Sequence, residues 1–453
     1  MMSRKGDAVK RLVFLSILLI IAFIPEARAY WSAGGGMDWQ SVPRIIYGPG
    51  DENIIRGRLD REPYKTLYAR LQSTAGQSYN LENHDSGPEQ QKASIASAAA
   101  FIYAMNRKVS GGSVLNFESE DERLAYGRLA ETLLAHMYTL SRMVGFDNAG
   151  LDILTSQEIV AYATAYDTLR GAAYPFEDES LVRENIVALA SDFYKDWTYD
   201  LKGAMNAYNE NHMSKSGSAM GVAAIVMNGY EPDPADDLEG YKKPEEWIKF
   251  AVKRTEFIVL DALISREGSY AEGPYYYSYT AINHEPLMRA LNRYTYGAGL
   301  DVDGEHYDDL YTDPRNSLVH DWLIRVRMPD GTAPAFDDGS PGGHYAWGVM
   351  GGLPHSDLYA WAWQHQPQSW YSGGSIDQTA FSIAAYDDEV SPLSPADAGW
   401  PPTQFQFDGG QAIFRQSWEP DSMYLLLAAE HGKAAGWSRK KDYDIIEGTG
   451  GHD

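Results

Sequence analysis

Residues 90–107, with the sequence QQKASIASAAAFIYAMNR, place Ile95, Ala98 and Ile102 at the three- and four-residue spacing of one helix face. Similar segments on both sides predict helices over about 62–74, 90–107, 120–143, 155–170, 180–202, 213–228, 243–265, 275–296, 314–327 and 355–365. Gly- and Pro-containing loops, such as Gly111-Gly112, separate them. About ten helices in series, with no strands predicted between them, favour a mainly α bundle, solenoid or toroid over a βαβ fold.

The sequence pattern changes after about residue 396. Pro401-Pro402 interrupts the chain, and residues 404–416 and 423–429 are rich in β-formers on either side of a turn. This pattern predicts a β-hairpin, which is marginally stable alone and needs partner strands. We therefore expect a helical domain over 30–396 and the first part of an antiparallel β-sandwich over 397–453. We also expect the chain to stop before that sandwich is complete.

The first 29 residues have the features of an export signal. Basic residues precede the apolar run 12–24, and Ala27-Arg28-Ala29 forms an A-x-A cleavage site. The apolar run is too short to span a bilayer comfortably, and no later run approaches that length. We therefore expect a secreted or periplasmic chain that begins at Tyr30 and has no integral membrane span.

Composition and charge narrow the class of protein. Hydrophobic residues make up 44% of the chain and aromatic residues 13%, which argues against disorder. The 31 Tyr and 12 Trp suit a carbohydrate binder. The net charge is −25, or −28 without the leader, which argues against nucleic acid as a partner and means that an acidic substrate needs a local basic patch. Because there is no Cys, disulfides and Cys-ligated metal sites are excluded.

Asn211-His212 opens a segment of small residues that runs from Ser214 to Gly221. Asn211 suits the N-cap of a helix, and for an isolated Asn-His pair this structural explanation is usually sufficient. The small residues would let another helix or a ligand approach closely. Tight helix packing alone also explains them.

A tyrosine-rich segment, Tyr275-Tyr276-Tyr277-Ser278-Tyr279, follows Pro274. Because Pro suits the first turn of a helix, these tyrosines are predicted at a helix N-terminus, where the positive end of the dipole favours a negative charge such as a tyrosinate. Tyr276 and Tyr279 are three residues apart and share a helix face. Burial in the core explains at least two of the four rings equally well.

A third polar segment, His452-Asp453, lies at the end of the sequence and by itself is typical of solvated surface.

Taken together, the segments resemble the heparinase II/III-like and alginate-lyase-like polysaccharide lyases over most of the mature chain. The resemblance rests on the order and spacing of Pro43-Arg44-Ile45 with the helix at 54–59, Asn211-His212, Gly268 to Pro274 with Tyr276 to Tyr279, Gly410 to Arg415 with Trp418, and Gly451-His452-Asp453. It implies an incomplete α/α toroid followed by an antiparallel β-sandwich.

The resemblance also implies roles for individual residues. Asn211 matches the Asn that neutralises a uronate carboxylate, and His212 matches a neighbouring His that assists it or acts as a base. Tyr276 matches the catalytic Tyr, with Tyr279 or Tyr275 as alternatives in register, and His452 matches a His from the sandwich. The candidate substrate-binding residues are Lys215, Arg266, Glu272 and Tyr279, with Arg325 and Arg327 as further basic candidates. No cofactor is certain. Family members with a structural zinc hold it mostly with residues beyond this His, so the resemblance allows such a zinc in a full-length protein, whereas this chain would lack most of the ligands.

This family's chemistry is β-elimination, which removes the C5 proton of a uronic acid and expels the oxygen at C4. A donor aimed at the carboxylate stabilises the charge that develops, and this is the role expected of Asn211 and His452. A tyrosine has an ordinary pKa of about 10 and needs a nearby cation or helix N-terminus to ionise; Arg266 is the nearest cation in the sequence. Either Tyr276 both removes and returns the proton, or His212 is the base and Tyr276 the acid.

We therefore predict a lyase that acts on an acidic polysaccharide or oligosaccharide. One alternative is a glycoside hydrolase on an α/α barrel, which would use paired carboxylates. Asp261 and Asp337-Asp338 are available for that chemistry, although the latter pair also suits a turn. A noncatalytic glycan-binding protein, which would keep the toroid without turnover, is the other alternative.

Overall fold

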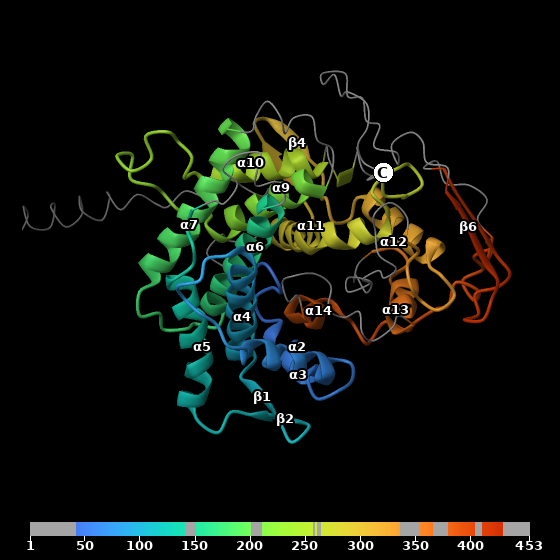
Figure 1. The fold of residues 1–453 in the computed structure, drawn as a ribbon, viewed down its shortest axis with the longest axis horizontal. Helices are drawn as coiled ribbons and strands as arrows, with labels where there is room; N and C mark the ends of the chain where they lie inside the picture. The colour runs from blue at the N-terminus through green and yellow to red at the C-terminus, as the bar shows by residue number, and fades with distance from the viewer. Residues whose placement is uncertain are drawn as a thin grey trace, which may run out of the picture.

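The computed structural model describes residues 42–140, 151–200, 211–256, 259–260, 264–335, 353–365, 379–403 and 410–428 (Figure 1). These residues are mainly helical, as predicted. The α-helices are α2 (Glu52–Arg58), α3 (Tyr64–Ala75), α4 (Ser86–Met105), α5 (Glu120–Ala135), α6 (Leu151–Gly171), α7 (Glu179–Lys195), α9 (Asn211–Val226), α10 (Pro244–Arg254), α11 (Gly273–Thr295), α12 (Pro314–Val326), α13 (Ser356–Gln364) and α14 (Thr379–Ala385). Within the part of the chain described here, none of the helices combines the length and apolar character that a membrane span requires.

Antiparallel hairpins accompany the helices, so the prediction of no strands between helices is wrong. The hairpins are β1 (Arg107–Ser110) with β2 (Ser113–Asn116), β3 (Leu300–Val302) with β4 (Glu305–Tyr307), and β5 (Gln411–Arg415) with β6 (Tyr424–Ala428). Gly111 and Gly112 have φ angles of 58° and 76°, which suit the two-residue turn that joins β1 to β2. The predicted loop is therefore a tight hairpin turn.

The buried segment at Arg44 joins the C-terminal ends of three long helices. Its backbone N–H donates to Asp167 Oδ2 of α6 at 2.6 Å, and its guanidinium donates to the Ile225 carbonyl of α9 at 2.6 Å. Its carbonyl accepts a hydrogen bond from Arg293 of α11 at 3.0 Å. A cation is favourable at helix C-termini because the helix dipole is negative there. The contacts thus fix which ends of α6, α9 and α11 lie together.

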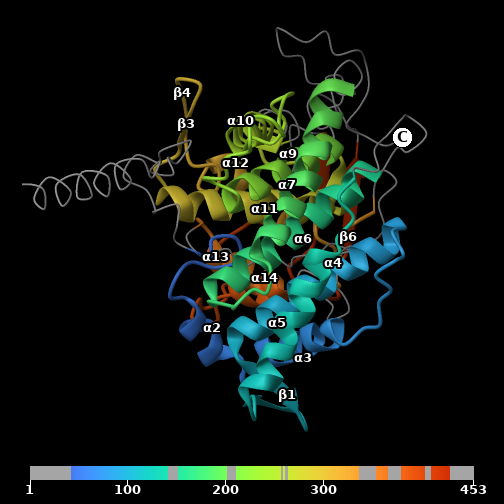
Figure 2. The same ribbon diagram turned by 90° about the vertical axis from the view of Figure 1, so that its left-hand side faces the viewer.

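These helices belong to a row in the middle of the molecule. α4 packs against α6, α6 packs against α9, and α9 packs against both α10 and α11 (Figures 1 and 2). The small residues of α9 make this possible: a Cβ atom at Gly221 would lie 2.5 Å from Leu287 Cδ1 and 2.8 Å from Ala251 Cβ. At Gly217 it would lie 2.9 Å from Arg254 Cβ. Neighbouring helices, rather than a ligand, therefore occupy this side of α9.

The last helix returns to the first ones. α14 packs against α3 and α4 (Figure 1). Tyr64 Oη of α3 donates to the Tyr386 carbonyl at 3.0 Å, and Arg58 Nη2 lies 3.3 Å from Asp387 Oδ1. The last helix of the described residues thus packs beside the first ones.

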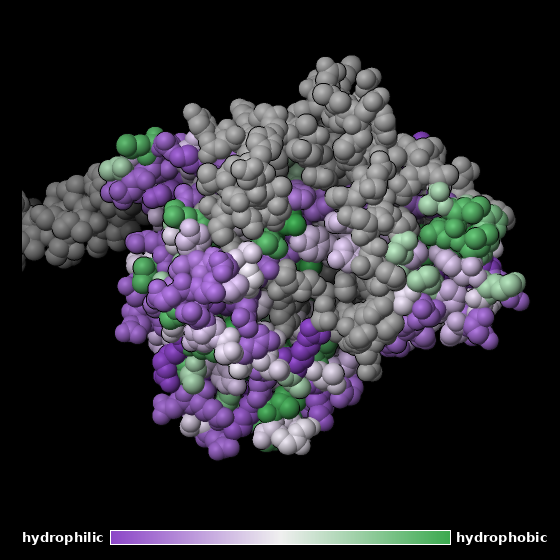
Figure 3. Space-filling view, in the orientation of Figure 1, coloured by the Kyte–Doolittle hydropathy of each residue, from purple (hydrophilic) through white to green (hydrophobic). Residues whose placement is uncertain are grey.

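The predicted C-terminal hairpin is present as β5 and β6. Its inner side is tied to α12, because Trp322 Nε1 donates to Gln411 Oε1 at 2.8 Å and Tyr424 Oη donates to the Val326 carbonyl at 2.6 Å. Its outer side carries Leu425 and Leu427, each about half exposed, and Figure 3 shows apolar side chains gathered there. The leader and the end of the predicted sandwich domain lie outside the described residues.

Candidate active site

The N-terminal ends of α6, α9 and α11 meet in a cluster of polar side chains. Asp152 is the second residue of α6, Asn211 and His212 begin α9, and Glu272 immediately precedes α11. Asn211 Nδ2 donates to Glu272 Oε1 at 2.7 Å, and His212 Nδ1 lies 2.8 Å from Asp152 Oδ2. Because Arg44 joins the opposite ends of these helices, the three run parallel and direct their positive dipole ends to this cluster.

Asp152 orients His212. The Nδ1 atom of His212 lies 2.9 and 2.8 Å from the two oxygens of the Asp152 carboxylate. An ionised carboxylate can only accept hydrogen bonds, so Nδ1 carries the donated hydrogen, and in the neutral ring the lone pair is on Nε2. His212 is 23% exposed at its side chain, whereas Asp152 is 7% exposed. The pair can therefore exchange a proton at Nε2 while the carboxylate stabilises the charged ring.

Glu272 holds Asn211 in place. Its other carboxylate oxygen lies 3.3 Å from Tyr270 Oη, which is also 3.3 Å from Thr280 Oγ1. Asn211 is buried, and its Oδ1 has no hydrogen-bond partner among the described residues. A buried amide oxygen in this state costs free energy unless a ligand or water donates to it. The side chain of Asn211 therefore carries a buried oxygen that the described residues leave unsatisfied, while Glu272 fixes its amide nitrogen.

The four tyrosines at the start of α11 have different surroundings. Tyr277 is buried, and its Oη lies 3.2 Å from His320 Nε2 and 3.3 Å from Glu285 Oε1. Tyr275, Tyr276 and Tyr279 are half-buried, and the rings of Tyr276 and Tyr279 have centroids 6.4 Å apart. Burial raises the pKa of Tyr279 to about 12, so Tyr279 is a neutral phenol at neutral pH.

Lys215 is the cation beside these tyrosines, although it does not reach solvent. Its Nζ atom donates to the Tyr279 carbonyl at 2.8 Å and lies 3.8 Å from the centre of the Tyr279 ring. Burial lowers the pKa of Lys215 well below its usual value, and the Asp152 carboxylate offsets part of that effect. Lys215 thus contacts both the backbone carbonyl and the ring of Tyr279 from the buried side. Arg266, the cation nearest in sequence, is exposed in the loop between Ile264 and Tyr270.

The structure therefore places Asn211 against Glu272, His212 against Asp152, and Lys215 against Tyr279, at the N-terminal ends of adjoining helices. Sequence reasoning missed Asp152, which lies 60 positions before His212 and has no local motif around it. His452, Asp261 and Asp337-Asp338 lie outside the described residues.

Comparison with protein-family models gave no match, and comparison with curated proteins gave no significant match. Among the residues described in the structure, no group of three or more His, Asp or Glu side chains is arranged to hold a metal ion.

A second buried cluster lies further along α11. His284 is buried and neither of its ring nitrogens has a hydrogen-bond partner among the described residues; its Nε2 is 3.8 Å from Glu285 Oε1. Burial lowers the pKa of His284 from 6.5 to about 4, with Glu285 opposing the shift and His320 and Lys215 adding to it. His284 is therefore neutral in the folded protein over most of the acidic range.

This histidine is expected to lower the folding stability as the pH falls from 6.5 toward 4. Above pH 6.5 the His284 ring is neutral in both the folded and the unfolded chain, and its contribution to folding stability is complete. As the pH falls toward 4, the ring takes up a proton only in the unfolded chain, and that contribution is lost. The shift corresponds to about 3 kcal/mol. Urea unfolding of the protein and of His284→Leu, at pH 7.5 and at about pH 4.5, should show the smaller pH effect in the variant. If the stability of both proteins falls by the same amount between these two pH values, His284 is not the source of the pH dependence.

Proposed function

We propose that this protein is a secreted or periplasmic polysaccharide lyase that cleaves a uronic-acid polysaccharide by β-elimination. The observation that carries the proposal is the placement of Asn211-His212, held by Glu272 and Asp152, beside the tyrosine-rich first turn of α11. Three residue types needed for the reaction thus come from two adjacent helix ends: an amide, an oriented imidazole and a phenol.

We also propose the finer architecture, an incomplete α/α toroid followed by an antiparallel β-sandwich. The parallel direction of α6, α9 and α11 and the return of α14 to α3 support a ring of helices. The apolar outer side of the β5–β6 hairpin supports a second β layer, because such a surface is normally covered and a lone hairpin is marginally stable.

Substrate binding at this cluster would place the uronate carboxylate at the helix N-termini. The amide nitrogen of Asn211 has two hydrogens, and its bond to Glu272 uses one of them. The second hydrogen can donate to the carboxylate as the C5 proton leaves. In the route in which Tyr276 is the base, a His212 protonated at Nε2 can donate to the same carboxylate. Three positive helix ends face the cluster and offset the negative charge of Asp152 and Glu272 there, on a protein with a net charge of −25.

Proton transfer then completes the elimination. The C5–H bond breaks, the C4–C5 double bond forms, and the C4–O bond breaks, while the departing oxygen receives a proton. Either Tyr276 removes the C5 proton and returns it to that oxygen, or His212 removes it at Nε2 and Tyr276 supplies the proton. Tyr279, which is held by Lys215 as a neutral phenol, positions the Tyr276 ring in both routes.

The two carboxylates of the cluster support a lyase over a hydrolase. Asp152 and Glu272 are buried and bonded to His212 and Asn211 respectively. A hydrolase needs two carboxyl groups that face the glycosidic bond. Here both carboxylates are bonded to other side chains instead.

Absorbance at the wavelength of an unsaturated uronate tests the proposal. The protein should release such a product from at least one of alginate, heparan sulfate, hyaluronan, chondroitin and ulvan, and Asn211→Ala should lower the rate by about 10²-fold or more. New reducing ends without absorbance would instead indicate a hydrolase. Saturable binding without either product would indicate a noncatalytic glycan-binding protein.

A further inference from the structure

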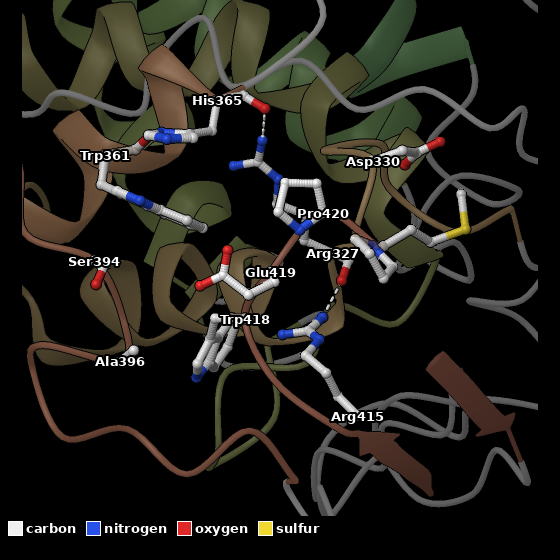
Figure 4. Close-up of a pocket in the computed structure, with 12 residues that line it drawn as sticks. Arg327, Asp330, Trp361, His365, Ser394, Ala396, Arg415, Trp418, Glu419 and Pro420 are labelled. Carbon is white, nitrogen blue, oxygen red and sulfur yellow. Dashed lines mark hydrogen bonds between the residues drawn. The ribbon is translucent and has the colours of Figure 1, made fainter. Parts of the chain in front are cut away.

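A cavity of about 340 Å³ lies away from the Asn211 cluster, where the end of α12, the helix α13 and the turn after β5 meet. None of its lining residues belongs to that cluster. Its charged and aromatic lining includes Arg327, Trp361, His365, Arg415, Trp418 and Glu419. Figure 4 shows the two indole rings on opposite sides of the opening, Ser394 on a third side, and the Glu419 carboxylate directed between the rings.

Two buried arginines build the wall of this cavity. Arg327 donates to the Ala362 carbonyl at 2.9 Å and to the His365 carbonyl, and Arg415 donates to the Arg327 carbonyl. Their guanidinium groups also lie against the tryptophans: Arg415 Cζ is 4.2 Å from the centre of the Trp418 ring, and Arg327 Cζ is 5.3 Å from the centre of the Trp361 ring. The His365 ring stacks on Trp361 at 4.7 Å. The indoles are therefore held rigidly before any ligand binds.

The charges around the opening select the class of ligand. Glu419 and Asp330 line the cavity and balance the two wall arginines, so the opening has no net positive charge to favour an anion such as a uronate. A cationic ligand between the indoles would be repelled by the guanidinium groups of Arg327 and Arg415, which already lie against these rings. An uncharged ligand meets neither penalty. Its apolar faces can pack on Trp361 and Trp418, and its hydroxyl groups can donate to the Glu419 carboxylate.

From this geometry we infer that the cavity is a second carbohydrate site, which binds an uncharged sugar unit between Trp361 and Trp418 with Glu419 as its hydrogen-bond acceptor. Its volume is at the small end of ligand pockets and suits about one or two sugar rings. The inference does not depend on elimination at the Asn211 cluster. It adds a neutral-sugar site, lined by different residues, to a protein whose proposed substrate is acidic.

Calorimetric titration of the full chain with neutral gluco-, manno-, galacto- and xylo-oligosaccharides tests this site. At least one should bind saturably, and Glu419→Gln and Trp361→Ala should each weaken binding by roughly tenfold or more. Glu419 is exposed, so Glu419→Gln should leave the fold intact. Tyr79→Ala, a change at a partly exposed aromatic residue between α3 and α4, is the matched control and should bind as the parent protein does. Circular dichroism verifies the fold of each variant.

Several results would overturn the inference. Absence of saturable binding to all four neutral series would do so, as would binding that survives both Glu419→Gln and Trp361→Ala in folded protein. Binding of tetramethylammonium, but of no neutral sugar, would identify a cation site instead. If a charged uronate oligosaccharide binds here as tightly as the neutral sugars, and loses affinity in the same variants, the predicted selectivity is wrong.

Discussion

Replacement of Asp152 by Asn is expected to lower kcat on a uronate substrate by about 10²- to 10⁴-fold. The Asp152 carboxylate accepts the Nδ1 hydrogen of His212 through two oxygens at 2.9 and 2.8 Å. An Asn amide can instead donate to Nδ1, which moves the ring hydrogen to Nε2 and removes the lone pair or the charged ring needed there. Because size and shape are nearly unchanged, substrate binding should fall much less than kcat.

A surface pair offers a matched control for this variant. His306 Nδ1 lies 2.8 Å from Asp301 Oδ1, and both side chains are more than half exposed. Asp301→Asn makes the same chemical change outside the cluster and should leave kcat within about twofold. The pH profile of kcat should also shift in Asp152→Asn, since the variant changes how His212 titrates. If both variants keep the parent rate, Asp152 has no role in the reaction.

Replacement of Tyr276 by Phe is expected to lower kcat by about 10²- to 10⁴-fold while KM changes little. The change removes one hydroxyl group and keeps the ring that packs against Tyr275 and Tyr279, with centroids 5.3 and 6.4 Å away. Whether Tyr276 is the base, the acid or both, the variant lacks the phenolic oxygen that accepts or donates the proton. Initial rates of double-bond formation across a range of substrate concentrations separate kcat from KM.

The neighbouring tyrosines provide the controls for Tyr276. Tyr279→Phe keeps the ring over Lys215 Nζ, and the hydroxyl that it removes has a pKa of about 12 and is poorly suited to act as a base. Tyr275→Phe tests the other possible register. Both should retain kcat within about tenfold of the parent. A large loss in either one, with Tyr276→Phe near the parent rate, would transfer the catalytic role to that residue.

Much of the helical fold could be predicted from the sequence, because long helices bury a face whose spacing is visible locally. The helices around Ala98 and Val222 lie within a few residues of their predicted ends. The hairpins β1–β2 and β3–β4 could not be predicted in this way, because strands of four and three residues carry too few positions to show alternation. Their turns were visible only as glycines.

The candidate site was partly predictable for the same reason. Asn211, His212 and Tyr276 belong to short local motifs, but their supports come from distant segments. Asp152 meets His212 only because α6 and α9 run parallel, and Glu272 meets Asn211 across 61 positions. Lys215 was predicted to bind substrate because a lysine can pair with a carboxylate or sulfate. Its complete burial depends on the packing of α9 against α11, which no local pattern shows.

A crystal structure of Tyr276→Phe with a bound uronate oligosaccharide is the most direct test of the proposed site. We expect one uronate carboxylate within hydrogen-bond distance of Asn211 Nδ2, with C5 of that sugar close to His212 Nε2 and to the position of the missing Tyr276 hydroxyl. A carboxylate bound elsewhere, or an amide and an aromatic ring too far apart to contact the same sugar, would contradict the proposed elimination site.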